Sequence, residues 1–344
     1  MKQKGWRMTT TALAAVALQA LSPVGVAAQD LTPVTVLLPI PEGIPFNPIV
    51  VAREKGFFAD AGIDVTSSVA DGSGYLSQQI VAGNAQFALM GAADAVVAYT
   101  KRDDVRVLFC NQVKNVYRIV AKAESGVTSM ADLSGKALGY TEPGGGESKL
   151  VAAAIDEAGL VVNETITLVP IGGAGPQSLV SLQNDTVQAY SSSFPDVAAL
   201  SVAGINWVDI TPEKYSNVPG ACMVTTEEVL SSEDGMKAAT ALAKGWVQAQ
   251  YYAIENGEDA LGTVCTAIES ACENEDAAKA LFSESMNLIT PPEGHRPGEL
   301  SPASWQTVVE ILSSGDIVAA DLDVTPLISG ANVEAVIAAA YEGH

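Results

Sequence analysis

Short apolar runs alternate with helical patterns along the first part of the chain. Residues 33–40 (PVTVLLPI) are apolar at nearly every position, which is typical of a strand buried on both faces of a parallel sheet. Residues 49–58 (IVVAREKGFF) repeat their apolar positions at helical spacing, and Gly56 provides the backbone freedom for a helix end. Residues 63–69 (IDVTSSV) follow as a second strand. This order predicts a β-α-β unit.

The same alternation continues through two further regions. Up to residue 112 the pattern predicts helices within 71–84 and 92–100 and strands at 86–91 and 104–112. The pattern starts again near residue 113, and the chain after 235 is chiefly helical. The strands predicted in this second region are 116–124, the end of 129–141, 166–172 and 187–194, and the segments 205–210 and 221–230 close the region. The predicted helices are 143–160, 175–186, 236–255, 258–271, 275–286, 302–313 and 331–341. The pattern predicts an α/β fold with mainly parallel strands, in two lobes followed by a helical wrap.

Residues 1–28 have the composition of an export signal. Lys2, Lys4 and Arg7 precede a short apolar run over 8–21, and small residues lead up to Ala28. The apolar run is too short to span a bilayer as a helix. We therefore predict a signal peptide that is cleaved near Ala28, with the mature chain in the periplasm; a buried N-terminal helix is the alternative.

The charge of the chain limits its partners. The formal net charge is −22, and removal of the basic signal segment makes the mature chain still more acidic. A nucleic-acid partner is not expected, because phosphate contacts need clustered lysine and arginine. Any anion site must create its own local positive potential.

Four cysteines, Cys110, Cys222, Cys265 and Cys272, permit one or two disulfides in an oxidising compartment. Four cysteines allow three full pairings, and the sequence does not choose among them. Cys265 and Cys272 can pair only if the helix breaks between them, because seven helical residues would separate their Cα atoms by ~10.5 Å.

Catalytic motifs are missing from the sequence. There is no G-x-S-x-G, H-E-x-x-H, Walker or G-x-G-x-x-G pattern, and the two histidines, His295 and His344, are isolated. Two such histidines also do not suggest a metal centre. We expect neither catalysis nor a metal or cofactor; an exported enzyme or a ligand-sensing module on the same fold are the alternatives.

Four segments carry a resemblance to a known family. They are VAREKGFFADAGIDV (51–65), YLSQQIVAGNAQFALMGAADAV (75–96), MADLSGKALGY (130–140) and VQAYSSSFPDVAAL (187–200). In order and spacing the chain resembles the periplasmic substrate-binding proteins of ABC importers, in the branch that includes the taurine, alkanesulfonate, nitrate and thiamine-pyrimidine binders. The likeness covers nearly all of the mature chain and is weak for the ligand, because these segments are scaffold.

The resemblance implies a type II periplasmic binding fold, with two α/β lobes joined by two crossing strands and a helical C-terminal wrap. The crossings are expected near 110–118 and 219–225. By the same analogy, residues 29–112 form the first part of lobe 1, residues 113–221 form lobe 2, and residues 222–344 complete lobe 1 and add the C-terminal helices. The family expectation for the oligomeric state is a monomer.

In an open α/β sheet, ligands bind beyond the carboxyl ends of the strands, where loops lead into helices. Five loops qualify: 39–47, 71–75, 91–94, 142–148 and 191–196. Glycines before helices can leave N–H groups and the positive end of the helix dipole open to an anion, although they are also ordinary capping residues. The predicted ligand-binding residues are Pro39, Asn47, Ser73, Gly74, Tyr75, Gly91, Asp94, Arg118, Gly144, Gly145, Gly146, Glu147, Ser148, Ser192, Phe194 and Asp196.

Roles for some of these side chains follow from their chemistry. Tyr75 and Phe194 would form apolar walls, with burial in the core as the alternative. Arg118 is the candidate counter-ion, with a surface role as the default. Acidic side chains in the same loops, which are Asp94, Glu142, Glu147 and Asp196, would suit an amine or an N–H-bearing heterocycle if they point inward; capping of the helix N-termini is the alternative. Where the pyrimidine-binding relatives have a cysteine-rich segment, this chain has YSSSFPD (190–196), which leaves a pyrimidine unsupported.

We therefore predict the solute-binding component of an ABC transport system. It would capture a small organic molecule, with a sulfonate, carboxylate or similar anion favoured, and deliver it to an inner-membrane ABC permease and its ATPase. A binder of a pyrimidine, a thiamine precursor or another nitrogenous heterocycle is the alternative ligand assignment.

Overall fold

The computed structural model describes residues 1–2, 5, 31–216 and 218–344. The predicted signal peptide, apart from Met1, Lys2 and Gly5, lies outside the described residues, as does its cleavage near Ala28. The chain divides into two compact units, Met1–Asp30 and Leu31–His344. All that follows concerns the second unit. None of the helices in the described part of the chain is both long and apolar enough to cross a bilayer.

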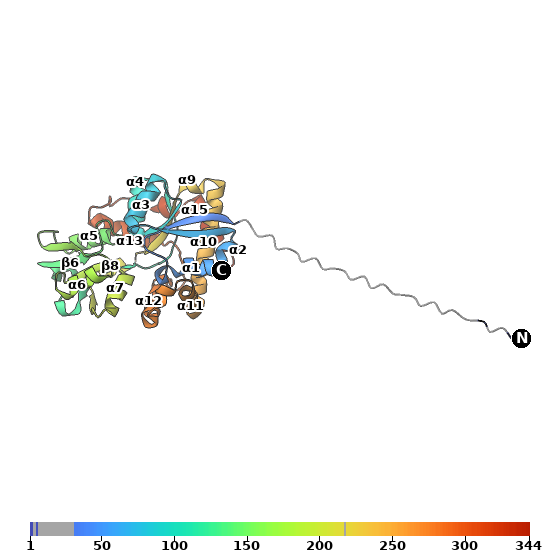
Figure 1. Cartoon of the computed structure of the whole chain (residues 1–344). Coiled ribbons are helices and arrows are strands. Elements are labelled where there is room, and N and C mark those ends of the chain that lie inside the picture. The colour runs from blue at the N-terminus through green and yellow to red at the C-terminus, as the bar shows by residue number, and fades with distance from the viewer. Residues whose placement is uncertain (3–4, 6–30, 217) are drawn as a thin grey trace. The chain divides into compact units, whose positions relative to one another are not determined.

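Two five-stranded sheets form the framework of this unit (Figure 1). The first sheet has the order β2 (Ile63–Val69), β1 (Thr32–Leu38), β3 (Phe87–Gly91), β10 (Ala221–Thr226) and β4 (Val105–Cys110). The second has the order β7 (Ile166–Pro170), β6 (Lys136–Tyr140), β8 (Ala189–Ser193), β5 (Tyr117–Lys122) and β9 (Trp207–Asp209). The predicted α/β class is confirmed.

One strand in each sheet runs against its neighbours. β10 is antiparallel to β3 and β4, and β5 is antiparallel to β8 and β9, while β1 is parallel to β2 and β3, and β6 to β7 and β8. The chain passes from β4 to β5 through residues 111–116 and returns from β9 to β10 through residues 210–220. Both antiparallel strands therefore follow a passage from one sheet to the other.

The helices follow the strands in the predicted alternation. In the first region they are α1 (Asn47–Glu54), α2 (Phe57–Asp60), α3 (Gly72–Ala82) and α4 (Ala92–Lys101). In the second they are α5 (Ser148–Glu157), α6 (Pro176–Gln183), α7 (Phe194–Val202) and α8 (Glu213–Ser216). The sequence analysis assigned no helix to α7, which begins with proline in its first turn, where a missing N–H costs nothing.

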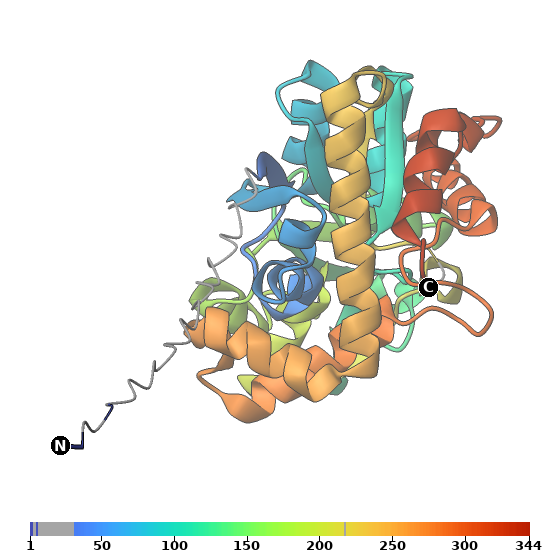
Figure 2. The ribbon, with the colours of Figure 1, turned by 90° about the vertical axis from the view of Figure 1, so that its right-hand side faces the viewer.

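The C-terminal region is helical, as predicted. Its α-helices are α9 (Glu227–Leu230), α10 (Glu233–Glu255), α11 (Gly257–Ala267), α12 (Glu275–Ile289), α13 (Pro302–Ser314), α14 (Thr325–Ile328) and α15 (Ala331–Ala340). Four 3-10 turns complete the elements: η1 (Ile44–Phe46), η2 (Ala123–Ser125), η3 (Met130–Leu133) and η4 (Glu269–Cys272). Figure 2 shows α10 as the long gold helix that faces the viewer.

The Gly-Phe-Phe stretch forms the corner between α1 and β2. Gly56 has φ 81°, a left-handed conformation that favours glycine, and it ends α1 before α2 begins. Phe58 is buried against α10, where a Cβ on Gly245 would lie 2.5 Å from its ring. Phe57 meets Tyr252 of α10 edge to face. The two rings thus pack the corner against α10. The local sequence pattern did not predict this contact.

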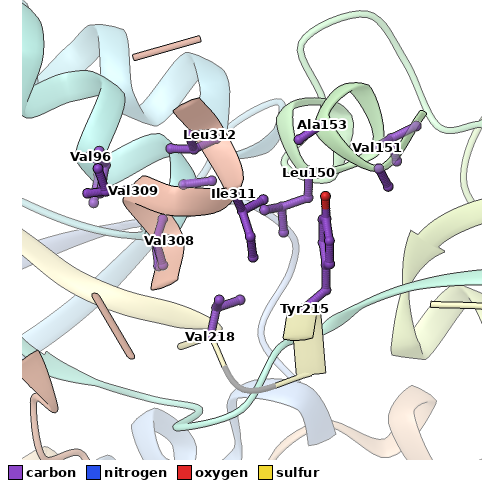
Figure 3. Packing of buried hydrophobic residues seen from close by; sticks show 14 of the residues in the cluster. Val96, Leu150, Val151, Ala153, Tyr215, Val218, Val308, Val309, Ile311 and Leu312 are labelled. Atoms are coloured by element: carbon purple, nitrogen blue, oxygen red, sulfur yellow. The ribbon is translucent and has the colours of Figure 1, made fainter. Parts of the chain in front are cut away.

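Helix α13 packs against α4, which follows a strand of the first sheet, and against α5, which follows a strand of the second. Figure 3 shows apolar side chains of α13, among them Val309 and Ile311, between Val96 of α4 and Leu150 of α5. The C-terminal region therefore contacts helices of both regions. The division into lobes at residues 112 and 221, with residues 222–344 completing lobe 1, stays a prediction.

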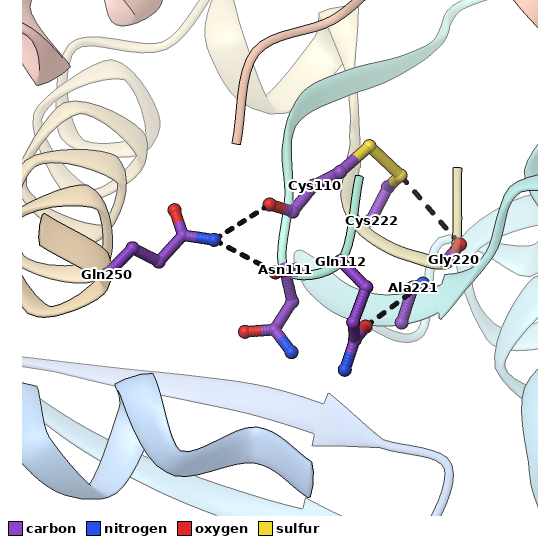
Figure 4. Close-up of a disulfide and its surroundings, with 7 residues drawn as sticks. All are labelled: Cys110, Asn111, Gln112, Gly220, Ala221, Cys222 and Gln250. Atoms are coloured by element: carbon purple, nitrogen blue, oxygen red, sulfur yellow. Dashed lines mark hydrogen bonds between the residues drawn. A yellow bond between two sulfur atoms is a disulfide. The ribbon is translucent and has the colours of Figure 1, made fainter. Parts of the chain in front are cut away.

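Both disulfides that the sequence left open are formed. Cys110 and Cys222 face each other in register on β4 and β10 (Figure 4). Cys265 and Cys272 pair because α11 ends at Ala267 and the chain turns into η4, which brings their Cα atoms to 5.4 Å. The helix break that this pairing required is present.

Candidate ligand-binding site

A cavity of about 200 Å³, here called the ligand cavity, lies where loops of both sheets converge. It is lined by residues from segments 39–46, 72–73, 112–117, 141–147 and 192–196, together with Gly173 and Ala221. The first of these segments follows β1, and the last two follow β6 and β8. The position agrees with the rule that ligands bind beyond the carboxyl ends of strands.

Two carboxylates of the lining are held by hydrogen bonds. Glu147 Oε1 accepts from the backbone N–H of Thr141, at 3.0 Å, and from the hydroxyl of the same residue. Asp196 Oδ1 accepts from Ala174 N at 2.8 Å, and its Oδ2 accepts from the hydroxyls of Ser192 and of Ser193, the latter at 3.1 Å. Burial raises the pKa of Glu147 above its ordinary value, although the bonds from Thr141 oppose this.

These two carboxylates stand at helix starts. Glu147 is the N-cap residue of α5, and Asp196 lies in the first turn of α7. A negative side chain there interacts favourably with the positive end of the helix dipole. Neither helix start has a side-chain cap hydrogen bond, but the two carboxylates place negative charge in the loops where the sequence analysis expected a bound anion. Among residues 31–216 and 218–344, no lysine, arginine or histidine lines the ligand cavity.

Aromatic rings form the apolar part of the lining, from Phe46, Tyr117 and Phe194. The hydroxyl of Tyr117 lies 3.4 Å from Ser73 Oγ, which also accepts a 3.1 Å hydrogen bond from Gly91 N. Burial is the main cause that raises the pKa of Tyr117, so its phenol stays neutral. A Cβ at position 146 would lie 1.9 Å from the Tyr117 hydroxyl oxygen, so only glycine fits at this position.

The structure brings only part of the predicted site together. The predicted residues that line the ligand cavity are Pro39, Ser73, Gly146, Glu147, Ser192, Phe194 and Asp196. A second hollow, lined by residues of segments 71–78, 94–101 and 142–149, contains four others, Gly74, Tyr75, Asp94 and Gly144. Tyr75 is half-exposed there, so it is not a wall of the ligand cavity.

The remaining predicted residues have other surroundings. Asn47 is buried and donates to Ile44 O and Ser285 Oγ, which ties α1 to η1 and α12. Gly91 donates to Ser73 Oγ and lies beside the ring of Tyr117, and Ser148 donates to the carbonyl of Gly145. A Cβ on Gly145 would contact the side chains of Thr141 and Glu147. Gly145 therefore packs against lining residues.

Arg118 does not lie in the ligand cavity. Its guanidinium bonds Glu284 of α12 at 3.1 Å and lies 3.8 Å from Asp209 of β9. The residue beside it, Tyr117, is the one that reaches the cavity. Successive residues of a strand point to opposite faces, so Arg118 points away from the cavity that Tyr117 lines.

Sequence reasoning also passed over other lining residues, among them Phe46, Gln112 and Thr141. A usable signal existed for all three, since Gln112 lies in the expected crossing, Thr141 ends a predicted strand segment, and Phe46 lies in the candidate loop 39–47. Within the described residues, no cluster of three or more His, Cys, Asp or Glu is arranged as a metal site.

A buried ion pair in the second hollow links α4 to α5. Lys149 Nζ bonds Asp94 Oδ1, and the carboxyl of Asp94 is fully buried. Burial raises the pKa of Asp94 to about 6, although Lys149 opposes the shift. The pair joins a helix of the first region to a helix of the second beside the ligand cavity.

Replacing Asp94 with asparagine should change how stability depends on pH. The folded-state pKa is above the ordinary value of 3.8, so the contribution of Asp94 to the free energy of unfolding is present below pH 4 and is lost as pH rises through 6. The loss is on the order of 3 kcal/mol, at 1.36 kcal/mol per unit of pKa. In urea unfolding between pH 4 and 7, the free energy of unfolding of the variant should therefore rise relative to that of the wild type as pH rises. Glu310→Gln, at an exposed position of α13, is the control; parallel curves for wild type and Asp94→Asn would contradict this expectation.

The sequence of the chain matches a known protein family. Residues 44–260 match the NMT1/THI5-like family, and the chain belongs to that family. A comparison with the sequences of curated proteins gives no match.

Solved structures share the fold over most of the chain. A protein from Bordetella bronchiseptica RB50 is 20% identical, with a TM-score of 0.70 over 89% of this chain and 97% of the other. The alkanesulfonate-binding protein SsuA from Xanthomonas axonopodis pv. citri, bound to MOPS, is 13% identical, with a TM-score of 0.63 over 87% and 99%. The periplasmic nitrate-binding protein NrtA from Synechocystis PCC 6803 is 16% identical, with a TM-score of 0.59 over 90% and 86%. The predicted periplasmic binding protein fold is confirmed.

Proposed function

We propose that the chain is the solute-binding component of an ABC importer. It captures one small organic molecule in the ligand cavity without altering it and delivers it to a membrane permease and its ATPase. Residues 1–28 would direct it to the periplasm, where it acts as a monomer. The observation that carries this proposal is the cavity itself, walled by the loops that follow strands of two separate sheets.

The names of structures that share the fold add support. Two of them are described as binding an alkanesulfonate and nitrate, and one as periplasmic. A nitrogenous heterocycle is the second candidate ligand, and one observation favours it over a sulfonate: Glu142, Glu147 and Asp196 line the cavity, and the described lining contains no basic side chain.

The proposal predicts a rise in melting temperature with one class of small solute. Mature chain stripped of ligand by unfolding and refolding would be screened against a metabolite library, and ligand at 100 times its dissociation constant adds about 2.7 kcal/mol to stability. Phe194→Ala, which removes a ring from the cavity, should reduce the rise. Tyr75→Ala, which removes a ring from the second hollow, should leave it unchanged.

Mass spectrometry of molecules released on unfolding the purified chain would identify a ligand retained from the cell. Chemical conversion of that molecule by the protein would contradict the proposal in favour of an enzyme. No shift with anions, amines or heterocycles, together with no released molecule, would end it.

A further inference from the structure

We propose that the ligand is a small organic cation that presents N–H donors to Glu147 and Asp196. This inference rests on the proposed solute-binding function and departs from the anion that the sequence favoured. It is carried by the direction of the hydrogen bonds around the cavity, by the charge of the lining and by the aromatic walls.

Three hydroxyl groups of the lining donate their protons to the protein's own carboxylates, while the hydroxyls of Ser73 and Tyr117 lie 3.4 Å apart and pair with each other. Thr141 donates to Glu147, and both Ser192 and Ser193 donate to Asp196. A hydroxyl has a single proton and two lone pairs, so these groups keep only acceptor capacity. A ligand therefore meets acceptors at this end of the cavity.

Backbone N–H groups near the helix starts are engaged as well. Those of Thr141 and Ala174 bind the same two carboxylates. The N–H of Gly145 bonds the carbonyl of Glu142, and the N–H of Phe194 bonds the carbonyl of Val116. The next residue of α7 is proline, which has no N–H. These four N–H groups are therefore not available to a bound anion.

Glu147 has capacity left for a ligand. The residue is only 2% exposed, and within the described chain its Oε2 accepts no hydrogen bond from another residue's N–H or O–H. This oxygen still has lone-pair capacity, so it can accept an N–H from a ligand in the cavity.

The charges around the cavity also favour a cationic ligand. Glu142, Glu147 and Asp196 line it. Two basic side chains nearby are paired elsewhere, Arg118 with Glu284 and Lys149 with Asp94. A cation would balance the carboxylates, whereas an anion would add like charge in a partly desolvated site.

The aromatic lining and the size of the cavity refine the class. Phe46, Tyr117 and Phe194 offer ring surfaces, and a cation within about 6 Å of a ring face is attracted by it. The volume of about 200 Å³ is below the ~300–1,000 Å³ that is usual for ligand pockets. The ligand is accordingly a compact amine or amidine with a short apolar body.

Two matched series of probes test this class by calorimetry on the ligand-stripped mature chain. Benzamidine, benzamide and benzoate share a planar ring, and butylamine, butanol and butanesulfonate share a chain. The cation of at least one series should bind at least tenfold more tightly than its anion. Glu147→Gln and Asp196→Asn should each weaken binding of that cation at least tenfold, and Glu310→Gln, which removes a charge from an exposed position, should not.

The outcomes separate the two proposals. Tighter binding of the anions than of the cations, or cation binding that both cavity variants leave intact, would overturn the cation class and keep solute capture. Absence of binding by every probe, with no molecule released on unfolding, would overturn both. Because the two variants are in different loops, misfolding of one leaves the other as the test.

Discussion

Replacing Cys110 and Cys222 with alanine is expected to lower the free energy of unfolding of the oxidised chain by about 4–5 kcal/mol. The disulfide closes a loop with a sequence separation of 112 residues, which contains the whole second sheet. In the chain-entropy model, a cross-link over ~100 residues restricts the unfolded chain by about 4.7 kcal/mol. Urea unfolding of the variant and of the wild type, both without reductant, measures the difference.

The second disulfide is the matched control. Cys265 and Cys272 are separated by only 7 residues, and the same relation assigns their cross-link about 2–2.5 kcal/mol. The double alanine variant at these positions should therefore lose roughly half as much stability as the first. Equal losses, or a greater loss from the short loop, would show that loop entropy does not govern the effect.

Gly74→Ala is expected to weaken ligand binding about 10- to 100-fold. A Cβ at this position of α3 would lie 2.4 Å from the carbonyl oxygen of Gly144, in the loop before α5. The obstacle is backbone, which cannot rotate away as a side chain can, so the two segments must separate. Overpacking of this kind costs about 1–3 kcal/mol, and each 1.4 kcal/mol is tenfold in affinity. Calorimetric titration with a ligand found in the screen measures the change.

A second glycine in a helix provides the comparison. Gly262 is exposed on α11, and nothing lies within 4 Å of a Cβ placed there. Gly262→Ala should keep wild-type affinity and add up to about 1 kcal/mol of stability through helix propensity. Wild-type affinity of Gly74→Ala would mean that α3 and the 142–148 loop do not approach each other in the bound protein.

The predicted elements agree with the structure where local physics decides them. The strand predicted at 63–69 is β2 to the residue, because β-branched residues between glycine-ended turns favour an extended chain. Gly83 ends α3 with φ 74°, as the helix-stop signal predicted. The missed helix α7 begins at Phe194, where the sequence offered a strand end and a proline without a clear helical period.

The candidate site was predicted less completely than the fold. The loops 39–47, 71–75, 142–148 and 191–196 all contribute to the ligand cavity, because chain order predicts where strands lead into helices. Which side chains face inward depends on the register of β5, which places Tyr117 at the cavity and Arg118 against Glu284. A one-residue change of register reverses the faces of a strand, and local sequence does not contain that information.

By itself the sequence determined the α/β alternation and the loops at which a ligand would be sought, since these depend on local periodicity and turn chemistry, and its resemblance to known segments indicated the family. Only the tertiary structure decided which cysteines pair, which ring lines the cavity and what meets the helix starts. Those outcomes depend on segments far apart in the chain. One case is Asp196, which accepts from Ala174 of another loop as well as from Ser192 of its own, so that an expected anion site becomes an acceptor-rich one.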